Sequence, residues 1–221
     1  MEWYSVKSQT DEKIIGAYPQ TNGMTPEYDL KKKNSVWNIP NLKLPDFEPD
    51  FDSFNLDKKA KLTDVISTGL ISACGLLLND KTKQILSRFN LPKHIYYPAT
   101  IWHKKEILKN YYWLQFAHDN TNEIVFESSQ FELTHPLPFF REESITLRNK
   151  EYAIVMATKA ANPDYELFPD KISLKNANNL DLLIFGFLYN NIYINNNLAS
   201  ALATANISGL TIKKIDPLTM A

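Results

Sequence analysis

The sequence predicts an α+β fold with a mostly antiparallel sheet and a few short helices. Alternating apolar and polar residues, typical of half-buried strands, recur along most of the chain. Two passages, residues 76–97 and 191–215, each have the pattern of a strand, a short helix and a second strand. Elsewhere strands and helices do not alternate regularly, which disfavours a helix-wound parallel sheet.

The N-terminal part of the chain predicts a short strand pair and then an extended segment. Apolar residues at Trp3 to Val6 and at Ile14 to Tyr18 indicate the pair. Residues 25–60 are rich in proline and charge, and their aromatic residues (Trp37, Phe47, Phe51 and Phe54) are expected to pin them to a core. We therefore expect residues 1–60 to pack on a main domain of residues 61–221. The alternative is that residues 1–221 form one continuous domain.

The remaining elements follow from local patterns. A helical or turn segment is expected from Thr63 to Gly69, and Asn79 or Asp80 should cap a helix that Pro92 prevents from continuing. Strand patterns occupy residues 94–97, 110–119, 123–134, 144–147, 153–158 and 182–189.

The passage 191–215 echoes the passage 76–97 at a constant offset of 116 positions (194 − 78). In both, an asparagine stands where its side-chain oxygen can cap the helix. The offset pairs Ile194 with Leu78, Asn195 with Asn79, Leu202 with Leu86, Asn206 with Asn90, and Ile207 with Leu91. Two similar strand–helix–strand units without a catalytic residue in either suggest an architecture that supports binding.

Composition narrows the functional classes. The 221 residues include 24 basic and 25 acidic side chains, so no basic excess favours nucleic acid or an anionic membrane. Cys74 is the only cysteine, which excludes an intrachain disulfide and a cysteine-cluster metal site. The first residues lack the pattern of a secretory signal, and the apolar runs are too short to span a bilayer. We expect a soluble cytoplasmic protein without a cofactor.

The layout of residues 60–216 resembles a family of bacterial immunity proteins found beside polymorphic toxins. Two passages carry the resemblance: Leu70 to Pro98, and the C-terminal run from Asp181 through Ile192–Ile194 to Ile207–Leu210. Asn195 stands where such proteins usually place a serine before the final helix, and both residues cap helices well. The resemblance implies a protein without catalytic activity that binds and neutralises a cognate toxin.

The candidate partner-binding residues are four carboxylates and two aromatic side chains. In an extended chain the carboxylates would share one face, with the phenylalanines between them on the other, and could meet a basic toxin surface. Exposed Tyr and Trp side chains are typical interface anchors. The candidates are Asp46, Glu48, Asp50, Asp52, Tyr111 and Trp113. For the carboxylates, the alternative is a solvated loop whose phenylalanines enter the core. For the aromatic side chains, the alternative is a sheet face that the N-terminal segment covers.

Two other functions remain open. One is a small enzyme with a cleft built from His118, Asp119, Glu123 and possibly Cys74, although a lone cysteine among apolar residues is typically buried. The other is an interaction module for an unrelated protein. The histidines (His94, His103, His118 and His135) lack the close spacing typical of zinc ligands, so no metal site is predicted.

Overall fold

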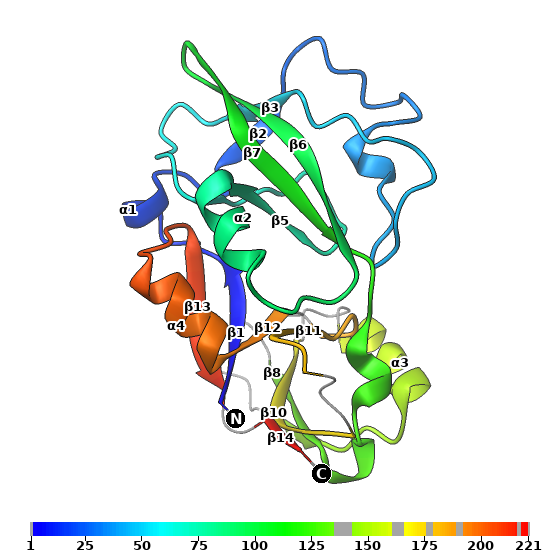
Figure 1. Cartoon of the computed structure of the whole chain (residues 1–221). Coiled ribbons are helices and arrows are strands. Elements are labelled where there is room, and N and C mark those ends of the chain that lie inside the picture. The colour runs from blue at the N-terminus through cyan, green and yellow to red at the C-terminus, as the bar shows by residue number, and fades with distance from the viewer. Residues whose placement is uncertain are drawn as a thin grey trace. The chain divides into compact units, whose positions relative to one another are not determined.

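The predicted α+β class is confirmed: short helices accompany sheets in which antiparallel pairs dominate. The computed structural model describes residues 2–134, 143–160, 166–175, 179–188, 192–215 and 218–220. Figure 1 labels the helices and strands along the chain.

Contacts divide the chain into two compact units. Unit 1 comprises Met1–Val6, Asp119–Ala199 and Ile212–Ala221, and unit 2 comprises Lys7–His118 and Ser200–Thr211. The boundary expected near residue 60 falls inside unit 2, which contains the chain on both sides of it.

Unit 2 is built on a six-stranded sheet of order β2-β3-β6-β7-β5-β4. Only β3 and β6 pair in parallel; the other neighbours are antiparallel. The strands are β2 (Thr21–Met24), β3 (Phe54–Leu56), β4 (Val65–Ile66), β5 (Gly75–Asn79), β6 (His94–His103) and β7 (Glu106–Phe116). The helices are α1 (Glu12–Ile15), α2 (Asp80–Leu86) and the 3-10 turn η1 (Val36–Asn38).

Two further sheets, whose described strands number four each, have the orders β11-β12-β1-β13 and β14-β10-β8-β9. Their strands are β1 (Trp3–Ser8), β8 (Gln130–Thr134), β9 (Glu143–Ile145), β10 (Glu166–Leu174), β11 (Leu182–Ile184), β12 (Ile192–Asn195), β13 (Leu210–Ile215) and β14 (Leu218–Met220). The helical elements are η2 (Asn120–Glu123), η3 (Phe126–Ser128), α3 (Lys150–Ala160) and α4 (Asn196–Thr204).

The two similar strand–helix–strand units predicted from the sequence are present as β5–α2–β6 and β12–α4–β13. At the offset of 116 positions, the first residue of α2 corresponds to that of α4, and the first residue of β6 to that of β13. An additional strand pairs antiparallel with the first strand of each unit: β4 with β5, and β11 with β12. The repeat is therefore longer than the sequence pattern indicated.

In the first repeat an aspartate orients the asparagine that caps the helix. The Asn79 Oδ1 atom accepts the Thr82 N–H at 3.1 Å, and its Nδ2 donates to Asp64 Oδ1 at 2.9 Å. The Asn79 N–H also donates to the carbonyl of Asp64 at 2.9 Å. Because the carboxylate holds the amide nitrogen, the amide oxygen is directed to the helix N-terminus.

The second repeat has the same arrangement. The Asn195 Oδ1 atom accepts the Leu198 N–H at 3.0 Å, and its Nδ2 donates to Asp181 Oδ1 at 2.6 Å. The Asn195 N–H donates to the carbonyl of Asp181 at 3.0 Å. Asp64 immediately precedes β4, which pairs with β5, and Asp181 immediately precedes β11, which pairs with β12. In both repeats the aspartate and the asparagine therefore join two paired strands and the helix that follows them.

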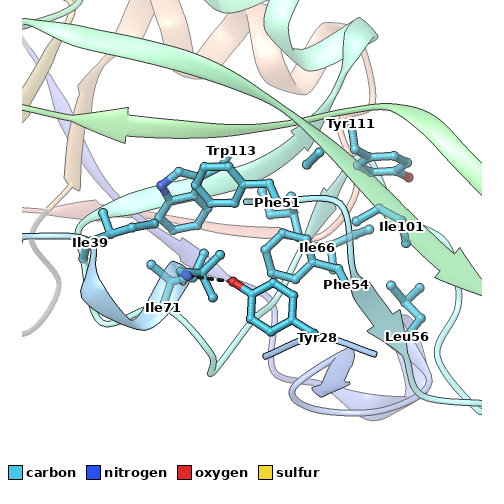
Figure 2. Packing of buried hydrophobic residues seen from close by; sticks show 14 of the residues in the cluster. Tyr28, Ile39, Phe51, Phe54, Leu56, Ile66, Ile71, Ile101, Tyr111 and Trp113 are labelled. Atoms are coloured by element: carbon cyan, nitrogen blue, oxygen red, sulfur yellow. Dashed lines mark hydrogen bonds between the residues drawn. The ribbon is translucent and has the colours of Figure 1, made fainter. Parts of the chain in front are cut away.

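The core of unit 2 holds the N-terminal segment in place. Phe51 and Phe54 are 2% and 0% exposed and pack near Trp113, whose ring lies 6.2 Å from that of Phe51 (Figure 2). The Tyr28 hydroxyl accepts the N–H of Val36 at 2.8 Å, drawn as a dashed line in Figure 2. The expected pinning by Phe51 and Phe54 is confirmed, whereas Trp37 is 54% exposed.

Three element predictions are corrected. The second N-terminal strand is in part the helix α1, capped by Asp11, whose side chain accepts the Lys13 N–H at 2.9 Å. Residues after Thr63 form β4 instead of a helix or turn. The strand predicted over 182–189 ends at Ile184, because the Gly186 N–H donates to Asp119 and the chain turns.

The predicted strand 153–158 is also wrong, because these residues lie in α3. The Asn149 side chain accepts the Tyr152 N–H at 2.8 Å, and its carbonyl accepts the Ala153 N–H at 2.9 Å. The Thr158 hydroxyl donates to the carbonyl of Ile154 at 2.9 Å, so the hydroxyl of this β-branched residue has a hydrogen-bond partner within the helix. Local capping thus overrides the strand preference of this run.

The paired caps give a test of the repeat. We expect Asn79→Ala and Asn195→Ala each to lower the free energy of unfolding by about 1–2 kcal/mol, since each removes a helix cap and a partner of a carboxylate. Asn197→Ala is the control, an exposed helical position expected to change stability by less than about 0.5 kcal/mol. Urea denaturation followed by circular dichroism measures the losses. Equal losses in all three variants would contradict the assigned role.

Candidate functional site

The predicted acidic segment lines a groove on unit 2. The groove has a volume of about 410 Å³. Its lining residues, which define the acidic groove below, are Asn34, Glu48, Pro49, Asp50, Phe51, Asp52, Tyr97 and Pro98. Three of the four predicted carboxylates therefore lie along one hollow of the surface.

Backbone hydrogen bonds fix the acidic segment against the sheet and the preceding loop. The Asp50 N–H donates to the Asn34 carbonyl at 2.9 Å, and the Thr100 N–H donates to the Phe51 carbonyl at 3.0 Å. Phe51 is the apolar anchor, and its ring lies 5.3 Å from that of Tyr97. Burial of one phenylalanine thus holds its acidic neighbours at the surface.

The carboxylates do not form the single face expected of an extended strand, because residues 46–52 form no strand. Asp46, Glu48 and Asp52 are exposed, and none of them has a salt bridge among the described residues. Asp46 does not line the groove. Asp50 is partly buried and forms a salt bridge with Lys32, a pairing that the spacing of the two residues in the sequence does not indicate.

Lys32 and Asp50 form an internal charge pair next to an aromatic ring. The Lys32 ammonium contacts the Asp50 carboxylate and lies 3.9 Å from the centre of the Tyr28 ring. Burial raises the pKa of Asp50, but the hydrogen bonds from Lys32 and from the Asp52 N–H outweigh it, so the pKa lies below its ordinary value. The Lys32 ammonium group therefore lies between the ring face of Tyr28 and the carboxylate of Asp50, which itself lines the groove.

Aromatic side chains border the acidic groove. Trp102 is 39% exposed, and its ring N–H donates to the Asp52 carbonyl at 3.0 Å. The Thr100 hydroxyl donates to the Asp52 carboxylate at 2.8 Å. Burial raises the pKa of the Tyr97 hydroxyl, and the negative charge of Glu48 raises it further. Carboxylates and aromatic rings thus lie close together on this surface.

The structure does not place the two predicted aromatic contacts at the surface. Tyr111 and Trp113 are 4% and 2% exposed. The Trp113 ring N–H donates to Gln115 Oε1 at 2.7 Å, and the Gln115 side chain donates to the Pro40 carbonyl at 3.2 Å. The N-terminal segment covers this face of β7, so both side chains lie beneath that segment and not at the surface.

Sequence reasoning missed several residues that the groove brings together. Asn34 and Lys32 precede Asp46, the first residue of the acidic segment, by 12 and 14 positions (46 − 34 and 46 − 32), and opposite charge was the only available signal for the Lys32–Asp50 pair. Tyr97 lies in the strand predicted over 94–97, whereas the exposure of Trp102 depends on the register of β6 beyond that predicted strand. β6 has a register shift between Ala99 and Ile101, which sequence alternation does not reveal.

The residues of the alternative enzyme cleft lie in other surroundings. Cys74 is 6% exposed, and the Asp119 carboxylate accepts the Gly186 N–H and pairs with Lys150 at 3.2 Å. None of the four residues His118, Asp119, Glu123 and Cys74 lines the acidic groove. His94 contacts the Pro92 carbonyl at 2.7 Å, His103 is buried and His118 is exposed, while His135 lies outside the described residues.

A second hollow of about 550 Å³ lies beside α1 in unit 2. It is the larger of the two, but it contains none of the predicted site residues. Its charged lining residues are Glu12, Asp57 and Lys59, and Tyr18 borders it with half of its surface exposed. Size alone does not assign a function to it.

Among the described residues, no group of three or more His, Cys, Asp or Glu side chains is arranged to hold a metal ion. No helix in the described ranges has both the length and the apolar character needed to cross a membrane. Comparison with models of known protein families finds no match to this chain, and no similar sequence is found among curated proteins.

The internal charge pair gives a prediction for titration. We expect Lys32→Met to raise the pKa of Asp50, because burial persists while the strongest opposing hydrogen bond is lost. Above the pKa of the unfolded chain, a lowered native pKa stabilises the fold, and this contribution is lost as pH falls through the native pKa. Because its native pKa is higher, the variant should gain less stability from Asp50 at neutral pH and should have lost all of this contribution at a higher pH than the unsubstituted chain.

Carboxyl-detected NMR titration measures the shift. Lys33→Met is the matched control, because Lys33 is exposed and has no salt bridge among the described residues. An unchanged Asp50 pKa in Lys32→Met would show that the ammonium does not set the charge of the groove.

Proposed function

We propose that this chain is an immunity-type protein, which binds a cognate bacterial toxin and neutralises it by occlusion. The observation that carries the proposal is the acidic groove with its border of exposed aromatic side chains. The resemblance of residues 60–216 to immunity proteins supplies the class of partner. The groove supplies a surface with the chemistry of a protein interface.

The charge of the groove favours a basic partner surface. Glu48 and Asp52 are exposed, and among the described residues neither forms a salt bridge that would cancel its charge. Complementary charge speeds association and fixes the register of two proteins. A toxin that acts on nucleic acid presents a basic substrate-binding surface, which such a groove would cover. Neutralisation then needs no chemistry by this chain.

The aromatic border supplies the apolar part of the interface. Trp102 is 39% exposed and donates to the Asp52 carbonyl, and Tyr97 lines the groove together with Glu48. Trp and Tyr are enriched at the residues that dominate binding energies, because they bury a large area with few rotatable bonds. Tyr97 and Trp102 therefore take the place of Tyr111 and Trp113 as the proposed aromatic contacts.

Co-expression with the candidate toxin encoded beside the gene for this chain tests the proposal. Restored growth and co-purification of the two proteins are the expected results. Absence of both would contradict neutralisation by binding. Co-purification with a non-toxic protein in its place would identify the chain as an interaction module for another partner.

Charge variants test whether the groove is the contact surface. We expect Glu48→Gln/Asp52→Asn to slow association with that toxin about tenfold at low salt, and to weaken the salt dependence of the rate. Asp46→Asn is the matched control, since Asp46 is an exposed carboxylate of the same segment outside the groove. Surface plasmon resonance measures the rates. An equal effect of Asp46→Asn would move the interface away from the groove.

A further inference from the structure

The repeat extends over almost the whole chain. The elements described between residues 3 and 103 and those between residues 106 and 220 follow the same order. β1 corresponds to β7, β2 to β8, β3 to β10, β4 to β11 and β5 to β12. The helix α2 corresponds to α4, and β6 corresponds to the pair β13–β14. In the first copy β2 pairs antiparallel with β3, and β3 pairs parallel with β6. In the second copy β8 pairs antiparallel with β10, and β10 pairs parallel with β14.

The register supports this correspondence residue by residue. Trp3 of β1 pairs with Asn195, and Tyr111 of β7 pairs with Asn79, which sets an offset of 108 positions (111 − 3) between the two first strands. At the same offset, Asp11 corresponds to Asp119. Each of these carboxylates accepts a backbone N–H two residues later, at 2.9 and 3.0 Å.

The connections after the first strands are also equivalent. The Gln9 N–H donates to the Gly209 carbonyl at 2.9 Å, and the Ala117 N–H donates to the Lys93 carbonyl at 2.8 Å. Gly209 and Lys93 are related by the offset of 116 positions found between the strand–helix–strand units. In both copies the chain thus leaves its first strand next to the start of a strand that belongs to the other copy.

Each first strand completes the sheet of the other copy. β7, which begins the second copy, lies between β5 and β6 of the first. β1, which begins the first copy, lies between β12 and β13 of the second. The two copies have therefore exchanged their first strands within one chain, and the exchange explains why Met1–Val6 is grouped with Asp119–Ala199 in unit 1.

We infer that the seat of β1 between β12 and β13 is an interaction surface for a second copy of this chain, whose β1 fits it as the chain's own β1 does. This inference is independent of the proposed toxin binding. Exchange of an identical element between protomers requires no new contacts and is a low-cost route to a dimer.

The contacts that the incoming strand would make are those of β1 itself. Trp3 and Val6 are 3% and 4% exposed, and Trp3 belongs to the core cluster of unit 1. The Ser5 hydroxyl donates to the Lys213 carbonyl at 3.4 Å, and Glu2 pairs with Lys214 at 2.5 Å. Because a second copy reproduces all of them, they do not favour one arrangement over the other.

The choice between the two arrangements depends on concentration and on the connection. Three residues, Gln9–Asp11, connect β1 to α1, whereas β1 forms hydrogen bonds with residues up to 208 positions away. The covalent connection gives β1 an effective concentration at its seat on the order of millimolar. Exchange between chains should therefore increase as the protein concentration during folding approaches that range.

A crosslinking experiment on the full chain tests the inference. A tagged Glu2→Cys chain and an untagged Lys214→Cys chain, both carrying Cys74→Ala, are unfolded and refolded together at graded concentrations. A short bismaleimide is then added. Neither chain has both cysteines, so a crosslink between positions 2 and 214 forms only when β1 of the tagged chain occupies the seat of the untagged one. Both substituted side chains are about half exposed, which limits the effect on folding.

The expected result is covalent capture of the untagged chain, in a fraction that rises with concentration, together with a dimer mass by light scattering. The control replaces Lys214→Cys by Lys81→Cys, whose side chain is 49% exposed and lies in α2 of unit 2. Capture no greater than with the Lys81→Cys control up to about millimolar protein would overturn the inference.

Discussion

The structure depends on an aspartate that orients an asparagine at the point where a strand becomes a helix. Asp64 holds Asn79 and Asp181 holds Asn195, so that each amide oxygen faces the first turn of a helix. Burial raises the pKa of Asp64, but hydrogen bonds from Ser208 and Asn79 outweigh it and keep the pKa below its ordinary value. The carboxylate is therefore ionised at neutral pH and can accept from the asparagine. One such unit fixes two strands and a helix, and its repetition gives both halves of the chain the same strand order.

The copies differ in what they insert between their second and third strands. The first copy inserts the segment of residues 25–53, which Phe51 anchors and which brings Glu48 and Asp52 to the surface. The second copy places β9 and α3 at the corresponding point. A repeated scaffold with different insertions separates the requirements of folding from those of recognition. This separation is why the acidic groove occurs in one copy, although the capping units occur in both.

The sequence predicted features governed by local chemistry and missed those governed by distant contacts. Helix capping by Asn79 and Asn195 and the spacing between them could be predicted, because a cap involves residues three positions apart. The pairing of β1 with β12 could not, since Trp3 and Asn195 meet only in the folded chain. Strand alternation placed Trp113 on one face of β7, but whether that face is covered depends on the path of residues 25–53. For the same reason Tyr111 and Trp113 could be expected at the surface, although both are buried beneath that segment.

The central claim is that residues 3–6 of β1 are an integral part of unit 1 through their pairing with β12, although β1 begins the copy that forms most of unit 2. Peptide-resolved hydrogen exchange of an Asn195→Ala variant tests it most directly, because loss of that cap loosens the sheet in which β12 lies. The account predicts faster exchange at residues 3–8 together with 192–195, and unchanged exchange at residues 94–103. Unchanged exchange at residues 3–8, while residues 192–195 exchange faster, would contradict it.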